Sequence, residues 1–223
     1  MEQGRLARWS PVSGIAFVVF AIAAGVIFSD APSPGASDDE ILAYYADSGN
    51  QTKFALAFLM TTVAAPLFLW FLGTLAARIR RVEGEPGWLS RIALVSGSAF
   101  VTVTFVGTAL SQFVPDAVNN DPDRFTLDPD VARLLTNAAY TLNPELAVPL
   151  SAPLVLATSV VALRTGLLPR WVSWGGVGVT VVSFVGFLVG PTFLFLWVVV
   201  VSGYLLGGTA PDTGSPEVPA PRP

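Results

Sequence analysis

The sequence has no cysteine and no histidine, and these two absences exclude many kinds of functional site. Without cysteine there is no disulfide, no thiol nucleophile and no iron–sulfur cluster. Without histidine there is no imidazole zinc site, no histidine-ligated haem and no Ser-His-Asp triad. The single lysine, Lys53, lies at the end of an apolar segment, which argues against a retinal protein. We therefore predict no cofactor and no catalytic residue.

Charge is also scarce. Charged residues make up 13% of the chain and hydrophobic residues 52%, whereas soluble domains have about 25% charged residues. The mean hydropathy is +0.62 and the pI is near 4.7. Nucleic-acid binding requires a clustered basic surface, so no nucleic acid is expected as a partner. The composition predicts an integral membrane protein whose first partner is the lipid bilayer.

Long apolar runs indicate how the chain crosses that bilayer. A spanning helix needs about 20 apolar residues. Uncharged runs lie at Val12–Phe28, Phe54–Ala77, Ile92–Phe113, Leu146–Leu163 and Trp171–Leu206. The last run would be about 54 Å long as one helix, too long for one crossing, and Gly190-Pro191 is the best point for it to fold back. We predict an all-α, polytopic transmembrane bundle of six helices in three hairpins, with five crossings as the alternative.

The basic residues predict the orientation of this bundle. Nine of the twelve fall on one side, namely Arg5, Arg8, Arg78, Arg80, Arg81, Arg91, Arg164, Arg170 and Arg222, and the other side carries Lys53, Arg124 and Arg133. Because basic residues favour the cytoplasmic side, both termini should be cytoplasmic. The chain then divides into a lead-in (1–10), a transmembrane domain (11–208) and a disordered proline-rich tail (209–223). The excess of arginine over lysine is typical of a high-GC bacterium, so the membrane would be the bacterial cytoplasmic (plasma) membrane.

A short motif recurs at the basic ends of the predicted helices. Residues 86–90 and 169–173 both fit P-x-W-[LV]-S, and Trp9 belongs to a looser third copy. Trp9, Trp88 and Trp171 would anchor the helices at the membrane interface. The pattern favours three hairpins in tandem, although interface chemistry alone can also produce it.

Both large outer connections are predicted to contain a short helix that lies on the membrane. Ser37 and Glu40 form a capping box before an apolar, aromatic segment. Asp128 and Pro129 suit the cap and first position of the second helix, which could continue into the fourth crossing. Simple interfacial packing and a cover over an outward-facing pocket are the two interpretations.

Ionisable groups inside the membrane are the usual functional pointers, and this chain has almost none. Glu145 lies near the outer boundary of the fourth crossing, close to Tyr140 and Asn143. Pro149 and Pro153 follow one turn apart, which predicts a kink of the kind found near binding cavities.

The third crossing carries a polar stripe of Thr104, Thr108, Ser111 and Gln112. Lipid cannot satisfy these side chains, so they should face other helices. Gln112 would lie at the depth of Glu145. The candidate ligand-binding residues are therefore Thr108, Gln112, Tyr140, Asn143 and Glu145. In the alternative interpretation Glu145 reaches water and the stripe only holds helices together.

Two further patterns have simpler interpretations. Gly186-x-x-x-Gly190 and Gly203-x-x-x-Gly207 permit close contact between helices. The segment 119–123 has the alternating acidic spacing of a calcium loop, but Arg124 stands where that loop needs glycine and no glutamate closes it. We predict no metal site.

The segment Leu163–Trp174, LRTGLLPRWVSW, resembles the loop R-x-G-L-[LI]-P-R-W-[LV] between the fourth and fifth helices of a broad family of bacterial six-helix membrane proteins of unknown function. The resemblance implies six helices. It brings no activity, catalytic residue or cofactor.

Three functional hypotheses follow. The first is a non-enzymatic accessory subunit or scaffold in a membrane assembly, with a protein partner or as a homo-oligomer. The second is an outward-facing site that binds or transports a lipid or apolar small molecule. The third is a membrane enzyme similar to an isoprenoid cyclase, with Glu145 as general acid.

Overall fold

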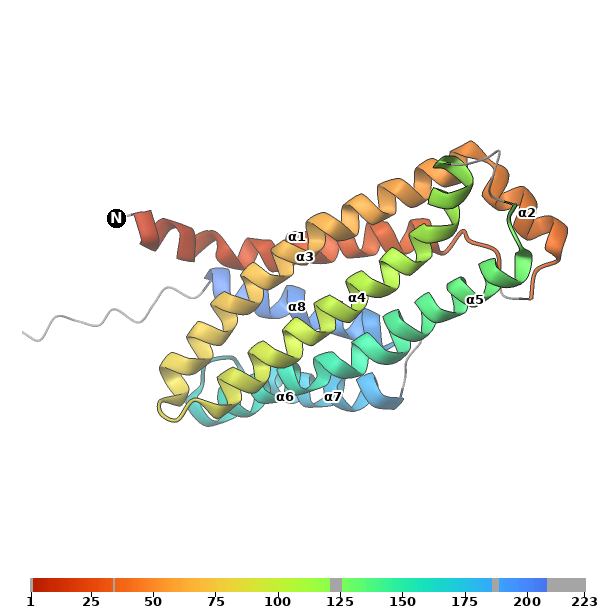
Figure 1. Cartoon of the computed structure of the whole chain (residues 1–223). Helices are drawn as coiled ribbons and strands as arrows, with labels where there is room; N and C mark the ends of the chain where they lie inside the picture. The colour runs from red at the N-terminus through yellow and green to blue at the C-terminus, as the bar shows by residue number, and fades with distance from the viewer. Residues whose placement is uncertain (1, 34, 121–125, 186–188, 208–223) are drawn as a thin grey trace, which may run out of the picture.

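The computed structural model describes residues 2–33, 35–120, 126–185 and 189–207, with side chains from residue 11 onward. Helices make up 89% of it, and the described ranges contain no strand. The helices, drawn in Figure 1, are α1 (Glu2–Phe28), α2 (Asp38–Ala46), α3 (Ser48–Glu83), α4 (Trp88–Asn120), α5 (Pro129–Tyr140), the π-helical segment η1 (Thr141–Ala147), α6 (Val148–Thr165), α7 (Arg170–Val185) and α8 (Gly190–Gly207). The predicted all-α bundle is confirmed. The predicted tail, 209–223, lies outside the described residues.

The connections between helices gather at two ends of the bundle. Helix α1 begins, α8 ends, and the α3–α4 and α6–α7 turns lie at one end, which carries the arginines of those turns and is called the basic end below (Figure 1). The opposite, acidic end holds α2 and the beginning of α5. Gly166 ends α6 with φ 73° and its amide donates to the carbonyl of Ala162, so the Leu163–Trp174 segment forms the α6–α7 turn.

Among the described residues five helices are long and apolar enough to cross a membrane, which corrects the prediction of six. These are Pro11–Phe28, Ser48–Glu83, Trp88–Asn120, Pro129–Thr165 and Gly190–Gly207. The last apolar run does fold back, since α7 ends at Val185 and α8 begins at Gly190. However, α7 has only 16 residues, or about 24 Å, less than the hydrocarbon thickness.

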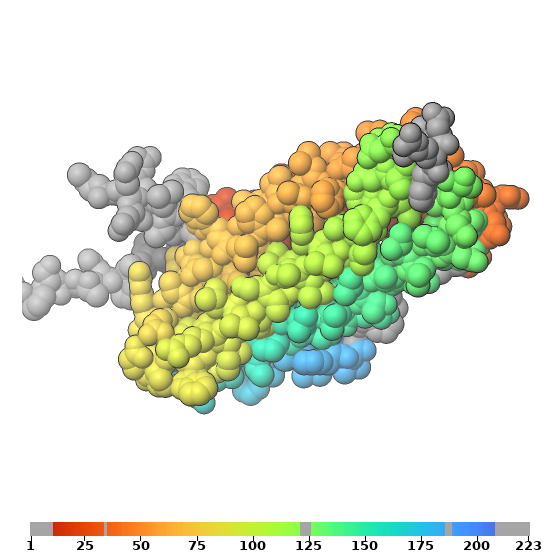
Figure 2. Space-filling view, in the orientation of Figure 1, coloured from red at the N-terminus to blue at the C-terminus, as the bar shows by residue number. Residues whose placement is uncertain are grey.

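The outside of the bundle is strongly apolar. In Figure 2, α3, α4 and the α5–α6 helix form neighbouring rows across one face. Large apolar side chains are exposed along these rows, including Leu59, Trp70, Val95, Val106 and Phe113. Soluble monomers rarely expose apolar surface of this extent. Together with the five apolar helices, this identifies a multi-pass membrane protein.

The predicted helix caps at the acidic end are confirmed, but the second outer helix is not separate. The amide of Glu40 donates to Oγ of Ser37, and the amide of Asp130 donates to Oδ1 of Asp128. Helix α5 then continues through η1 into α6 as one 37-residue span. The proline at Pro144 lacks an amide hydrogen, which favours the change from α-helical to π-helical bonding there.

A side chain of α4 is inserted into the backbone of α6. The hydroxyl of Ser96 donates to the carbonyl of Leu150 (2.6 Å) and accepts from the amide of Leu154 (3.0 Å). It therefore stands between two groups that would bond directly in a regular helix, close to Pro153. Ser96 fixes α4 against α6 by hydrogen bonds as well as by packing.

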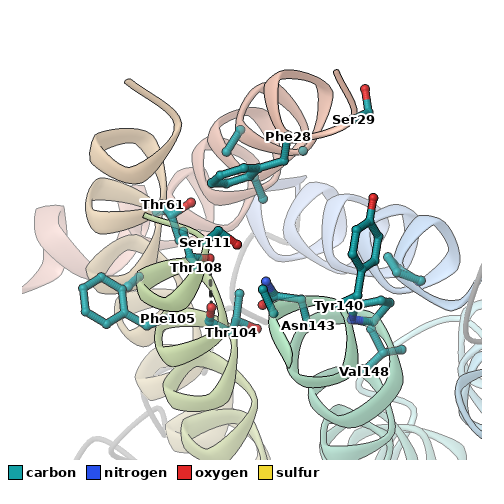
Figure 3. Close-up of a pocket in the computed structure, with 18 of the residues that line it drawn as sticks. Phe28, Ser29, Thr61, Thr104, Phe105, Thr108, Ser111, Tyr140, Asn143 and Val148 are labelled. Atoms are coloured by element: carbon teal, nitrogen blue, oxygen red, sulfur yellow. Dashed lines mark hydrogen bonds between the residues drawn. The ribbon is translucent and has the colours of Figure 1, made fainter. Parts of the chain in front are cut away.

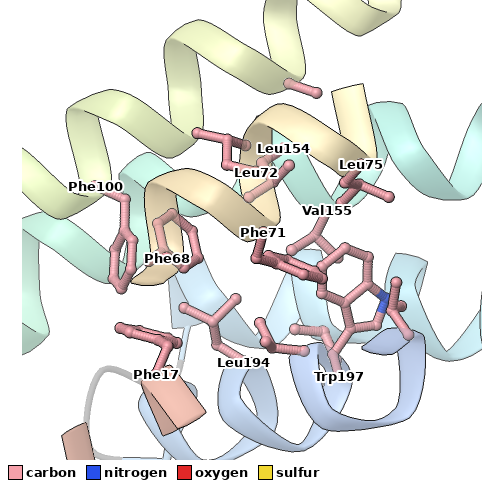
Figure 4. Close-up of a cluster of buried hydrophobic side chains, with 14 of the residues drawn as sticks. Phe17, Phe68, Phe71, Leu72, Leu75, Phe100, Leu154, Val155, Leu194 and Trp197 are labelled. Carbon is pink, nitrogen blue, oxygen red and sulfur yellow. The ribbon is translucent and has the colours of Figure 1, made fainter. Parts of the chain in front are cut away.

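The core lies between α1, α3, α4, α6 and α8 (Figure 4). Phe68, Phe71, Leu72 and Leu75 of α3 are completely buried. Phe17 of α1 stacks on Phe68 with a centroid distance of 4.8 Å. Helix α3 thus forms the centre of the bundle.

Small residues let the helices approach closely, but among the described glycines of the predicted motifs this holds for Gly190 and not for Gly203 or Gly207. A Cβ on Gly190 would lie 2.9 Å from Cγ1 of Val148, so Gly190 does make a close contact. Gly203 and Gly207 face outward, with no atom within 4 Å of an added Cβ, so neither packs against a described helix of this chain. Gly186 lies outside the described residues. The tightest α7 contact instead involves Gly176, which lies against Ser159 of α6 and Trp197 of α8.

The two described anchor tryptophans point outward at the basic end. Trp88 is 66% exposed at the start of α4, and Trp171 is 62% exposed at the start of α7. The side chain of Trp9 is outside the described part of the chain. The serines of the repeated motif, Ser90 and Ser173, are buried and donate back to the carbonyls of Gly87 and Pro169.

Candidate functional site

A cavity of about 420 Å³ occupies the half of the bundle nearer the acidic end. Its walls come from α1, α3, α4, η1 and α8, and residues of α2 and α5 close its outer end. Ligand pockets in proteins commonly have volumes of about 300–1,000 Å³. The cavity is therefore large enough for a small molecule.

Aromatic rings close both ends of the cavity. Toward the middle of the bundle lie Phe17, Phe100 and Phe195, with Phe17 at 6.3 Å and 5.8 Å from the other two ring centroids. Toward the acidic end lie Tyr45 and Phe54, whose centroids are 5.9 Å apart. These packed rings give a rigid apolar container.

One side of the cavity is polar. Thr61 of α3, Thr108 and Ser111 of α4 and Asn143 of η1 line it, and they are called the polar wall below. Figure 3 shows the three hydroxyl residues on one side, with Asn143 extending toward α4 from η1. Asn143 fits there because Gly107 has no side chain, and a Cβ on Gly107 would lie 2.9 Å from Oδ1 of Asn143.

Three of the five candidate residues line the cavity, namely Thr108, Tyr140 and Asn143. Glu145 does not, and its side chain is exposed. Two residues along a helix turn by about 200°, so Asn143 and Glu145 face opposite ways. Glu145 and Gln112 therefore do not line this cavity together, although their predicted depth in the membrane is the same.

Gln112 is also outside the cavity lining. It is buried, its Nε2 donates to Oδ1 of Asp116 at 2.9 Å, and its Oε1 has no partner. On α4 it lies about 100° from Ser111, at the edge of the stripe turned away from the cavity. Its role in the described structure is to hold a turn of α4.

The cavity reaches the surface between α1 and the end of α5. The exposed residues of its lining are Gly25 on α1, Ser29 in the turn after α1, and Tyr140, which is 52% exposed. In Figure 3 Tyr140 extends toward α1, across from Ser29. Gly25 leaves this mouth open, because a Cβ added there meets no atom within 4 Å.

The outer end is covered by α2 and α5, which are joined by an arginine. Arg133 of α5 donates to Oδ1 of Asp38 (2.6 Å) and to the carbonyl of Ala36 (2.8 Å), across 95 and 97 residues of chain. Beneath this link, the hydroxyls of Tyr45 and Thr136 lie 3.4 Å apart. We call α2 and α5 together the outer cover.

The two tyrosines of α2 remain neutral. Burial raises the pKa of Tyr44 to about 12, with smaller contributions from Tyr45 and Asp30. Burial also raises the pKa of Tyr45, although its hydrogen bond with Thr136 acts in the opposite direction. Of these two tyrosines, Tyr45 lines the cavity, where it is a neutral phenol.

The cavity has no formal charge. No Asp, Glu, Lys or Arg is among the described residues that line it. Nor do the described ranges bring three or more acidic residues together as a possible metal site; Asp121 and Asp123, considered above, lie outside those ranges. The arrangement offers apolar contact and neutral hydrogen bonds.

Most of the residues that line the cavity were not predicted from the sequence. Thr61 lies in an apolar run with no stripe around it, and the phenylalanines resemble lipid-facing residues in a sequence. The spacing of Tyr140 and Asn143, three apart on one helix face, is the signal that could have separated them from Glu145.

Comparison with known proteins adds nothing to this site. No family model, curated protein or solved structure matches the chain. The resemblance of the α6–α7 turn to a six-helix membrane family stays a prediction.

Proposed function

We propose that this protein binds a neutral, largely apolar small molecule, such as a lipid, in the cavity between α1, α3, α4, η1 and α8. The observation that carries the proposal is the size of the cavity together with its uncharged lining. Pockets of this size, mostly apolar and with a few placed polar groups, are typical of small-molecule sites.

The aromatic rings at both ends of the cavity favour an apolar occupant. Hydrocarbon suits the aromatic ends better than water, which needs two to four polar partners.

We also propose an orientation with the basic end in the cytoplasm of a bacterium, so that the cavity lies in the outer half of the membrane. The arginines at that end support this orientation.

The proposal can be tested by blocking the mouth of the cavity and identifying the bound molecule that is then lost. Gly25→Trp places a large side chain at the mouth, where an added Cβ meets no atom. Gly73→Trp is the matched control, because Gly73 on α3 is also exposed and open but does not line the cavity. Each protein is purified in mild detergent, and its organic extract is analysed by mass spectrometry.

We expect a molecule that is enriched in the wild type and in Gly73→Trp and is lost from Gly25→Trp. Identical extracts from all three would contradict the proposal. Native mass spectrometry of the same samples tests the alternative of an accessory subunit or homo-oligomer, which a stoichiometric second polypeptide or second copy would favour. The cyclase hypothesis receives no support, because Glu145 is outside the cavity.

A further inference from the structure

The polar wall lies opposite an apolar wall. The side facing Thr61, Thr108, Ser111 and Asn143 is made by α1 and α8, with Ala21, Ala24 and Leu194 among its residues. A molecule in this cavity therefore meets hydrogen-bonding groups on one side and mostly hydrocarbon on the other. This asymmetry favours an amphiphilic ligand, which has one polar part and one apolar part.

The hydrogen bonds already made by the polar wall specify what such an amphiphile must supply. The hydroxyl protons of Thr61, Thr108 and Ser111 are donated to the carbonyls of Ala57 (3.0 Å), Thr104 (2.9 Å) and Gly107 (3.3 Å). Each hydroxyl oxygen keeps lone pairs that can accept.

Asn143 adds an acceptor that no described residue satisfies, and its Nδ2 group adds a donor. Its Oδ1 is buried and has no hydrogen-bond partner. A buried polar atom without a partner costs about 1–3 kcal/mol. A hydrogen-bond donor on the ligand would remove that cost, and the Nδ2 group of Asn143 can donate to the same ligand group.

The absence of charge from the described lining excludes an ionic head group. A buried carboxylate or phosphate needs a cation or several donors to offset the loss of its hydration. The polar wall has no cation, its hydroxyl protons are engaged, and the Nδ2 group of Asn143 is the one donor that it keeps for a ligand. A hydroxyl group on the ligand carries no charge and supplies a hydrogen-bond donor, so it suits the polar wall.

Building on the proposed function, we infer that the ligand is a neutral lipid alcohol whose hydroxyl group donates to the polar wall while its hydrocarbon fills the aromatic container. This assigns a chemical class to the ligand. It also separates the site from one for fatty acids or lipid phosphates.

The experiment compares three photoreactive probes on the purified full-length protein. They are hexadecanol carrying a diazirine, its methyl ether, and the corresponding hexadecanoic acid in its ionised form. The ether keeps the length and the oxygen but cannot donate, so it isolates the donor. Labelling is measured from the intact mass, and the labelled peptides are then identified.

We expect the alcohol to label lining peptides about fivefold more strongly than the ether, which corresponds to one net hydrogen bond. The acid should label less than the alcohol. Asn143→Leu should bring alcohol labelling down to the ether level and leave ether labelling unchanged.

A second pair of variants covers the case in which Asn143→Leu fails to fold. Thr61→Val and Thr62→Val each remove one hydroxyl that donates to its own helix, at 3.0 Å and 2.9 Å, but only Thr61 lines the cavity. Thr61→Val should weaken the preference for alcohol over ether, and Thr62→Val should not.

Failure of this inference and failure of the proposed function give different results. If alcohol and ether label equally and Gly25→Trp blocks both, the cavity binds apolar molecules but the inferred hydroxyl is wrong. Stronger labelling by the acid also overturns the inference. If Gly25→Trp blocks no probe, the proposed function itself is wrong.

Discussion

Replacing Gly176 with alanine should destabilise the protein, because Gly176 is where α7 lies against both α6 and α8. A Cβ on Gly176 collides with Oγ of Ser159 and lies 2.8 Å from Nε1 of Trp197. Both neighbours are buried, at 1% and 4% exposure, so neither can move freely. Overpacking of this kind costs about 1–3 kcal/mol.

Gly178→Ala is the matched control for this prediction. Gly178 lies on the same helix, and an added Cβ there meets no atom within 4 Å. Both variants gain about 0.5–1 kcal/mol from the preference of helices for alanine, so the difference between them isolates the packing contribution. We expect Gly176→Ala to be less stable than Gly178→Ala by about 1–3 kcal/mol.

The assay is unfolding by SDS in mixed micelles, followed by circular dichroism. Intrinsic fluorescence, to which Trp197 contributes together with the other five tryptophans, gives a second signal. Equal stability of the two variants would refute the packing of α7 between α6 and α8. It would also remove the basis for treating α7 as part of the bundle.

Three other outcomes can be measured on the same protein. Ser96→Ala should lower the free energy of unfolding by about 1–3 kcal/mol, since it leaves a carbonyl and an amide of α6 without their bridge; an unchanged unfolding curve would contradict the bridge. Because the chain has no cysteine, an impermeant maleimide should label Asp39→Cys in intact cells but Glu85→Cys only after lysis, and the reverse pattern would invert the proposed orientation. Burial raises the pKa of Tyr44 to about 12, so the folded state favours the protonated phenol. The stability that this provides is complete below pH 10 and is lost as the pH rises toward 12. Tyr44→Phe should weaken this alkaline loss in unfolding experiments, and an identical pH profile would show that Tyr44 is not the cause.

The parts of the fold that were predicted correctly are those set by local chemistry. The caps at Ser37 and Asp128 depend on residues within one turn of each helix, and both formed as expected. The break before Gly190 depends on glycine and proline alone. The count of crossings was wrong because it assumed that an apolar run of sufficient length divides into two full spans, whereas α7 stops after 16 residues.

The candidate site was predicted only in part because its residues depend on helix phase. Tyr140 and Asn143 share a face and reached the cavity, whereas Glu145 attracted attention as a charge and points away. A charged residue can be recognised in a sequence, but packing decides which side of its helix faces the cavity. The aromatic ends, formed by Phe17, Phe100 and others, could not be predicted, since lipid-facing and cavity-facing phenylalanines carry the same sequence signal.

The link between Arg133 and Asp38 has a consequence for the order of assembly during synthesis. The outer cover joins residues 95 positions apart, and chains emerge from the N-terminus first. Helix α2 is therefore synthesised well before its partner on α5 exists. Until α5 has been made, the cover over the space between α1, α3 and α4 is incomplete. The ion pair between Arg133 and Asp38 is thus one of the later contacts that this bundle can form.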